Sequence, residues 1–222
     1  MSISAIIFDL DDTLYDEIDY VCSGFKAVAE QFAVIYGLQA DKIYDMMIGL
    51  FNEDRNDVFG RLVKQLSLDI SVVAEMVNVY RAHEPHIHLR QDAAFILKYA
   101  KEAGYKIGLI TDGDSRRQRA KLRALGIEDV FDAVIISGEN PGGIGKPDAY
   151  VYSRCLSVLG VRPEEAAYVA DNPAKDFIGA KALGIKTIRL VNSRGLYKHD
   201  NIDKHMDADY IIHDLHQLAD II

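Results

Sequence analysis

The chain has 222 residues, of which 49% are hydrophobic and 27% charged, so a disordered, collagen-like or low-complexity protein is excluded. Its 25 Lys and Arg against 34 Asp and Glu side chains give a formal net charge of −9, which disfavours nucleic acid and anionic membranes as partners. Two cysteines, no basic leader and no apolar stretch near the ~18 residues of a membrane span lead us to expect a cytoplasmic protein.

Short, nearly continuous apolar runs predict strands that are covered on both faces, as in a parallel sheet. These runs are Ala5 to Phe8, Lys106 to Ile110, Ala133 to Ile136, Ala167 to Ala170 and Lys186 to Val191. Segments with helical spacing separate the later runs, and residues 209–222 are expected to form a short edge strand and a closing helix. The alternation predicts an α/β fold with a doubly wound parallel sheet.

The connection between the first two predicted strands is too long for a simple crossover. Apolar residues recur there at helical period, as at Val21, Phe25, Val28 and Phe32, and Gly37 is a candidate helix end. We expect an inserted helical domain over residues 16–88 and an α/β core made of residues 1–15 and 89–222. After the insertion, Asp92 is expected to cap the next helix.

Three predicted strands are followed by, or end in, a polar residue: Asp9, Thr111 and Asp171. The carboxyl ends of parallel strands share one edge of a sheet, and open α/β sheets bind their ligands outside that edge. We therefore expect these three side chains to converge although they lie far apart in the sequence.

Asp9 and Asp11 stand two residues apart where the chain leaves the first strand. A carboxylate can attack phosphorus to give an aspartyl-phosphate, and a second one can protonate the leaving oxygen and then deprotonate the hydrolytic water. The alternative is an acidic turn in which Asp12 or Thr13 merely caps the next helix.

Two further segments suit a phosphate group. Thr111-Asp112-Gly113 offers a hydroxyl and backbone N–H groups at a helix start, although an ordinary strand-to-helix turn has the same composition. Lys146 precedes Pro147, which is expected at the first position of a helix, and its charge would neutralise repulsion between an aspartate and a phosphate. The alternative is a surface lysine.

Asp171 and Asp176 lie five residues apart and, with Asp9, supply oxygen ligands that suit Mg²⁺. A cation is needed because these acids would otherwise repel an anionic substrate. The alternative is that Asp176 makes only a local cap or ion pair while Asp171 faces solvent.

Four segments in this order, FDLDDTLYD, LITDG, GKPD and VADNPAKDFIGAKALG, resemble the four motifs of the haloacid dehalogenase (HAD) superfamily, in its subclass with a helical cap inserted after the first motif. The resemblance covers nearly the whole chain and implies a Rossmann-like core. It implies Asp9 as nucleophile and Asp11 as general acid/base. It also implies Thr111 as the phosphate-binding hydroxyl, within the segment Thr111-Asp112-Gly113, and Lys146 as the neutralising lysine.

The same resemblance implies a magnesium site. Asp9, the backbone carbonyl of Asp11 and Asp171 match the family's metal ligands, and Asp176 matches the outer acid that supports the metal or its water. Ala170 departs from the family, whose members usually have Gly before the metal-binding Asp; this matters only if the turn requires positive φ.

Two positions favour one chemistry within the superfamily. Dehalogenases and phosphonatases lack an acid at the position of Asp11, and sugar phosphomutases usually have Gly-Val or Gly-Ile where this chain has Asp12-Thr13. The resemblance therefore implies a Mg²⁺-dependent phosphatase of a small phosphomonoester, such as a sugar phosphate, a nucleotide or a similar metabolite. A phosphomutase and a non-catalytic module that binds a phosphorylated ligand remain the alternatives.

Overall fold

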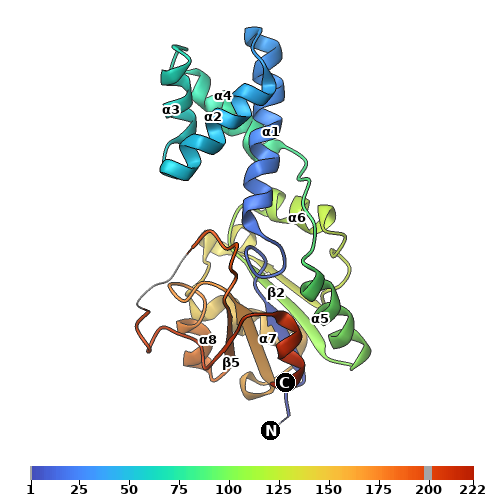
Figure 1. Ribbon diagram of the computed structural model, residues 1–222. Coiled ribbons are helices and arrows are strands. Elements are labelled where there is room, and N and C mark those ends of the chain that lie inside the picture. Colours follow the sequence, from blue (N-terminus) through green and yellow to red (C-terminus); the bar gives the residue numbers. More distant parts are fainter. Residues whose placement is uncertain (1, 198–201) are drawn as a thin grey trace. The chain divides into compact units, whose positions relative to one another are not determined.

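The computed structural model describes residues 2–197 and 202–222 and contains a six-stranded, all-parallel sheet of order β3-β2-β1-β4-β5-β6 (Figure 1). The strands are β1 (Ala5–Phe8), β2 (Lys106–Thr111), β3 (Ala133–Ile136), β4 (Ala166–Ala170), β5 (Lys186–Leu190) and β6 (Tyr210–Ile212). The predicted α/β fold class is confirmed. The bounds predicted for β1 to β5 differ from these by one residue at most, because doubly covered strands carry the continuous apolar runs that reveal them.

The first strand lies in the middle of the sheet. All four residues of β1 are fully buried, and it pairs with β2 on one side and β4 on the other. Phe8 is aligned with Leu109 of β2 and with Val169 of β4, so these three strands end at nearly the same level. Residues that directly follow the strands therefore meet at one edge.

Helices join the strands in the α/β core. They are α5 (Gln91–Glu102), α6 (Ser115–Ala124), α7 (Ala149–Leu159) and α8 (Ile178–Leu183), with short 3₁₀ helices η1 (Ser137–Glu139), η2 (Pro141–Gly143), η3 (Pro163–Glu165) and η4 (Leu215–Asp220). Because parallel crossovers are right-handed, connections that run in opposite directions along the sheet place their helices on opposite faces.

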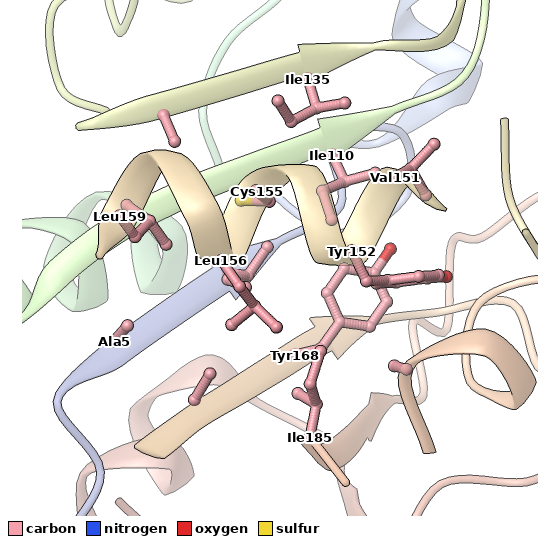
Figure 2. Packing of buried hydrophobic residues seen from close by; sticks show 14 of the residues in the cluster. Ala5, Ile110, Ile135, Val151, Tyr152, Cys155, Leu156, Leu159, Tyr168 and Ile185 are labelled. Carbon is pink, nitrogen blue, oxygen red and sulfur yellow. The ribbon is translucent and has the colours of Figure 1, made fainter. Parts of the chain in front are cut away.

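Helix α7 packs closely on the sheet. Val151, Cys155 and Leu159 lie against apolar side chains of β1, β2 and β3 in one buried cluster (Figure 2). A Cβ added at Gly108 of β2 would come within 2.8 Å of the Cys155 sulfur, so only glycine permits this approach. Gly108 in β2 therefore determines how closely α7 can approach the sheet.

The chain divides into two units, one formed by Met1–Ile18 and His88–Ile222 and the other by Asp19–Ile87. The remaining α-helices are α1 (Glu17–Tyr36), whose first two residues belong to the first unit, α2 (Ala40–Glu53), α3 (Val58–Gln65) and α4 (Val72–Ala82). In the second unit Phe25 has ring-centroid distances of 5.8 Å to Phe51, 5.9 Å to Phe59 and 5.8 Å to Tyr80. Such edge and tilted aromatic contacts supply this unit with a core of its own.

Several predicted helix ends need correction. Pro147 is not the first residue of a helix, because α7 begins at Ala149 and Asp148 caps it by accepting a hydrogen bond from the Tyr150 N–H at 2.8 Å. Asp92 is not the cap of α5, because the N-cap of this helix is Arg90. Asp92 lies in the first turn of α5, and its carboxylate accepts the backbone N–H of Leu215 at 3.0 Å. The closing segment is a strand followed by a 3₁₀ helix.

Gly37 ends its helix as predicted. It directly follows α1 and has φ +63°, the left-handed conformation that glycine adopts without strain. In the part of the chain that the structure describes, no helix is both long and apolar enough to cross a bilayer.

Candidate active site

The strand ends bring together side chains that are distant in the sequence. Asp9 directly follows β1, its N–H donates to the Val169 carbonyl of β4 at 2.9 Å, and Asp171 directly follows β4. Thr111 is the last residue of β2, the neighbour of β1 on the other side. The edge of the sheet predicted to bind a ligand therefore carries an acid, a hydroxyl and a second acid on three adjacent strands.

Lys146 reaches this edge from the segment before α7. Its side chain is fully buried, and its Nζ contacts Asp9 Oδ1, lies 2.7 Å from Asp176 Oδ1 and 3.3 Å from the Tyr168 hydroxyl. Burial disfavours the charged form, but Asp176 and Asp9 together hold the pKa of Lys146 well above its usual value. A permanent positive charge therefore sits against the Asp9 carboxylate, and the surface-lysine alternative is wrong.

Three acids form a cluster at the same place. One carboxylate oxygen each of Asp9, Asp171 and Asp176 lies within 4.8 Å of the others. Burial raises the pKa of Asp9 to about 6 despite Lys146, and burial together with Asp9 raises the pKa of Asp171 well above its usual value. Crowded, desolvated carboxylates of this kind fit a hard divalent cation, which takes oxygen ligands and offsets their repulsion.

Asp176 also has local partners. Its Oδ2 accepts the N–H of Asn172 at 3.0 Å, and its Oδ1 accepts the Tyr168 hydroxyl at 3.1 Å. Asp176 therefore makes the local contacts that the alternative expects, but it is also fully buried and belongs to the acid cluster.

Asp11 has a different environment from Asp9. Its Oδ1 accepts the Tyr15 hydroxyl and lies 2.6 Å from the Lys121 ammonium, and its Oδ2 accepts the Gln118 side-chain N–H at 3.1 Å. Burial would raise the pKa of Asp11, but Lys121 and these hydrogen bonds outweigh it, so the pKa lies below its usual value. The pKa of Asp9 is thus raised and the pKa of Asp11 lowered, although both acids belong to the first motif.

The Thr111-Asp112-Gly113 turn is held by its neighbours. The Thr111 hydroxyl accepts a hydrogen bond from the Gln118 side-chain amide at 2.5 Å. The Asp112 carboxylate accepts the backbone N–H of Lys146 at 3.1 Å, and the backbone N–H of Gly113 donates to the Ser137 hydroxyl at 2.8 Å. Thr111 is only 1% exposed. The turn therefore presents its hydroxyl in a fixed position, while the Gly113 N–H is already engaged.

Asp12 organises the chain that follows. It has φ +56°, and its carboxylate accepts the N–H of Glu17 at 2.8 Å and the N–H of Leu196 at 2.7 Å. The Asn192 side chain donates to the Asp12 carbonyl at 3.1 Å. Neither Asp12 nor Thr13 is the N-cap of the next helix, because α1 begins at Glu17, but the Asp12 carboxylate accepts the backbone N–H of that first helical residue.

Ala170 causes no strain. It is a fully buried residue of β4 and is not among the residues with positive φ in the described part of the chain. The turn does not require glycine at this position, so alanine leaves the placement of Asp171 unchanged.

Tyr15, Gln118 and Lys121 were not predicted to belong to the site. Gln118 and Lys121 lie three residues apart on the helix that follows Thr111, so they share one helix face. That spacing, together with a position directly after a site motif, is the signal in the sequence that points to them.

Comparison with known proteins gives consistent results. The family model described as haloacid dehalogenase-like hydrolase matches residues 6–190. The chain is similar to glyceraldehyde 3-phosphate phosphatase of Methanocaldococcus jannaschii, 32% identical, with 99% of this chain and 97% of that protein covered. It is also similar to phosphoserine phosphatase of Thermus thermophilus, 37% identical over 57% of this chain and 49% of that protein. Among solved structures, HAD phosphatase from Thermococcus onnurineus aligns with a TM-score of 0.64 at 26% identity, covering 99% of this chain and 97% of that one.

Proposed function

The chain belongs to the haloacid dehalogenase-like hydrolases, and from this we propose that it is a Mg²⁺-dependent phosphatase that hydrolyses a small phosphomonoester through a phosphorylated Asp9. The observation that carries the proposal is the arrangement at the strand ends, where Lys146 contacts Asp9 and three carboxylates lie within 4.8 Å of one another. An acid nucleophile, a fixed positive charge and a cation site are what attack on a phosphate dianion requires.

In this mechanism Asp9 attacks the phosphorus atom and becomes phosphorylated. Lys146 reduces the repulsion between the incoming phosphate and Asp9, and it does so at every physiological pH because its pKa is held high. The buried hydroxyl of Thr111, in the Asp112-Gly113 turn, binds a phosphate oxygen. Positioning and electrostatic stabilisation supply most of the catalysis of phosphoryl transfer.

Asp11 is proposed to move the protons. Its lowered pKa keeps Asp11 ionised in the free protein, so it must first take up a proton from solvent. It passes this proton to the leaving oxygen in the first step, and the carboxylate that remains deprotonates the hydrolytic water in the second. Both of its oxygens have donors in this structure, from Tyr15, Lys121 and Gln118, so its position is defined before substrate arrives.

A divalent cation is proposed to bind Asp9, the Asp11 carbonyl and Asp171, with Asp176 in support. When bound, the cation neutralises charge on the substrate phosphate and on the acids around it. The helical unit Asp19–Ile87 is proposed as the cap that excludes bulk water during the reaction.

The relatives indicate which substrates to try first. The relatives from Methanocaldococcus jannaschii and Thermus thermophilus are named as phosphatases of glyceraldehyde 3-phosphate and of phosphoserine, both small phosphorylated metabolites. We propose a substrate of this size, and a reducing cytoplasmic compartment, which agrees with Cys22 and Cys155 being free thiols.

Purified protein is expected to release phosphate from at least one small phosphomonoester, and to do so only with Mg²⁺. A panel of glyceraldehyde 3-phosphate, phosphoserine, a sugar phosphate, a nucleoside monophosphate and p-nitrophenyl phosphate, ranked by kcat/KM, tests this. A 2-chloro acid in the same panel tests the dehalogenase chemistry of the wider superfamily. Halide release without any phosphate release, or tight binding without turnover, would contradict the proposal.

Magnesium is expected to stabilise the fold at pH 7.5 and to have little effect at pH 5. Asp9 and Asp171 have raised pKa values, so in the metal-free fold these two acids bind protons more tightly than in the unfolded chain. The stability that Asp9 contributes is lost as pH rises from about 3.8 through about 6, and the contribution of Asp171 changes in the same direction. A cation offsets this loss only where the acids are ionised. At a hundredfold excess of Mg²⁺ over its Kd, Tm should rise by about 5 °C or more at pH 7.5.

The control for this experiment is a pair of matched substitutions. Asp171→Asn should reduce the Mg²⁺-dependent rise in Tm, whereas Asp129→Asn, at an exposed position of the same unit, should leave it unchanged. An equal rise at both pH values, or an undiminished rise in Asp171→Asn, would rule out the proposed cation site.

A further inference from the structure

One buried amide touches both the proposed acid/base and the proposed phosphate-binding hydroxyl. Gln118 is 2% exposed, and its Nε2 lies 3.1 Å from Asp11 Oδ2, 2.5 Å from Thr111 Oγ1 and 3.0 Å from the Asp112 carbonyl oxygen. A carboxylate and a carbonyl at one end of the amide require its N–H₂ there, since an amide oxygen would face two acceptors. The orientation of Gln118 is therefore set by its surroundings.

We propose that Gln118 is a positioning residue for phosphoryl transfer, which aligns the Thr111 hydroxyl for the substrate phosphate and the Asp11 carboxylate for proton transfer at the same time. The inference rests on the proposed function. It adds to that function a residue that acts through Asp11 and Thr111 and is not itself proposed to bind the phosphate or the cation.

The contact with Thr111 sets the direction of its hydroxyl proton. A threonine hydroxyl has one O–H and two lone pairs, and Gln118 occupies a lone pair by donating to it. The Thr111 O–H is thereby kept for an acceptor on its other side, which in the proposed function is a phosphate oxygen. Removing the Gln118 donor leaves the hydroxyl free to rotate.

The contact with Asp11 sets the plane of its carboxylate. Tyr15 and Lys121 both bind Oδ1, whereas Gln118 binds Oδ2. Donors on both oxygens restrict rotation about the bond to the carboxyl group. Without Gln118 the carboxylate would lose this donor at Oδ2.

The helix places the amide rigidly. Asp114 caps α6 by accepting the Arg117 N–H at 3.1 Å, and the Gln118 N–H donates to the Asp114 carbonyl at 3.0 Å. A Cβ built on Gly113, which has φ +137°, would lie 3.4 Å from the Gln118 Cδ. The glycine of the turn therefore packs directly against this side chain, and both are fixed relative to Thr111.

Gln118→Met, which keeps the unbranched shape but removes the donor, is the test, with Gln118→Glu as a second variant. In the presence of Mg²⁺, inorganic phosphate is expected to bind about tenfold more weakly to the variants by calorimetry, because the Thr111 hydroxyl is no longer aligned. For turnover, kcat should fall about 100-fold with glycerol phosphate but about tenfold or less with p-nitrophenyl phosphate, whose leaving group needs little protonation.

The control is Arg123→Met on the same helix, an exposed side chain paired with Glu128 at 3.9 Å, which should change neither measurement. In a Thr111→Val background, Gln118→Met should cause little further loss of phosphate affinity, since the two residues act through one contact. The melting temperature of each variant shows that it is folded.

The outcomes separate the two proposals. Wild-type protein that releases no phosphate from any ester contradicts the proposed function, and the calorimetry then judges the alignment of Thr111 on its own. If the wild-type protein is active, two results in the Gln118 variants overturn the proposed role. One is an equal fractional loss of kcat on both esters, because a merely structural defect would not distinguish the two leaving groups. The other is an unchanged affinity for phosphate.

Discussion

The Asp9→Asn variant is expected to fold and to lose phosphatase activity by about 10⁴-fold or more. An amide of the same shape cannot attack phosphorus, and the proposed covalent intermediate then has no acceptor. The loss should appear in kcat with every substrate that the wild-type protein hydrolyses, measured as phosphate release at saturating Mg²⁺. Such uniformity distinguishes a missing nucleophile from a change in specificity.

The stability of this variant provides its control. Lys146 keeps Asp176 as an ion-pair partner when Asp9 is neutral, and one of three crowded acids is removed. We therefore expect a metal-free Tm close to that of the wild-type protein, while Asp129→Asn, at an exposed position, should alter neither activity nor Tm. Full activity in Asp9→Asn would eliminate the covalent mechanism.

The Lys146→Met variant is expected to lose both activity and stability. The Lys146 side chain is fully buried between Asp9 and Asp176, so its removal leaves two buried carboxylates without the lysine ammonium that pairs with them. Breaking a buried ion pair in this way costs about 3–5 kcal/mol of unfolding free energy. Activity should fall by about 10³-fold, because one electrostatic donor at the reacting group is worth that much.

Two further variants separate these effects. Lys146→Met combined with Asp176→Asn should recover much of the unfolding free energy in urea titrations at pH 7.5, since the charge mismatch is reduced, but it should not recover activity. Lys98→Met is the matched control, because Lys98 is 75% exposed and its pair with Glu102 at 3.8 Å contributes little. Recovery of activity in the double variant would show that Lys146 serves the fold alone.

The strands and the meeting of their ends followed from the sequence for a physical reason. In a doubly covered parallel sheet, the apolar run and the polar residue that ends it are both local features, as in Phe8 followed by Asp9. The parallel arrangement then brings Asp9, Thr111 and Asp171 to one edge without any knowledge of side-chain packing.

Side chains that reach the site from helices were not recognised because their direction depends on how each helix sits on the sheet. Gln118 and Lys121 follow a run of arginines and look like part of a solvated face, yet both are buried against Asp11. The start of α7 was misplaced for a related reason. Pro147 fits a first helical turn, but Asp148 is the better cap, and capping chemistry decided the boundary.

The central position of β1 has a consequence for how the protein is made. β1 (Ala5–Phe8) leaves the ribosome before the strands that hydrogen-bond to it on either side, β2 and β4, the later of which is Ala166–Ala170. Four side chains that are fully buried in the finished fold must wait unpaired in the nascent chain, where exposed apolar segments favour aggregation or chaperone binding. The Asp9 carboxylate next to them acquires Asp171 and Asp176 only late in translation, so a shorter nascent chain lacks the complete cluster of acids.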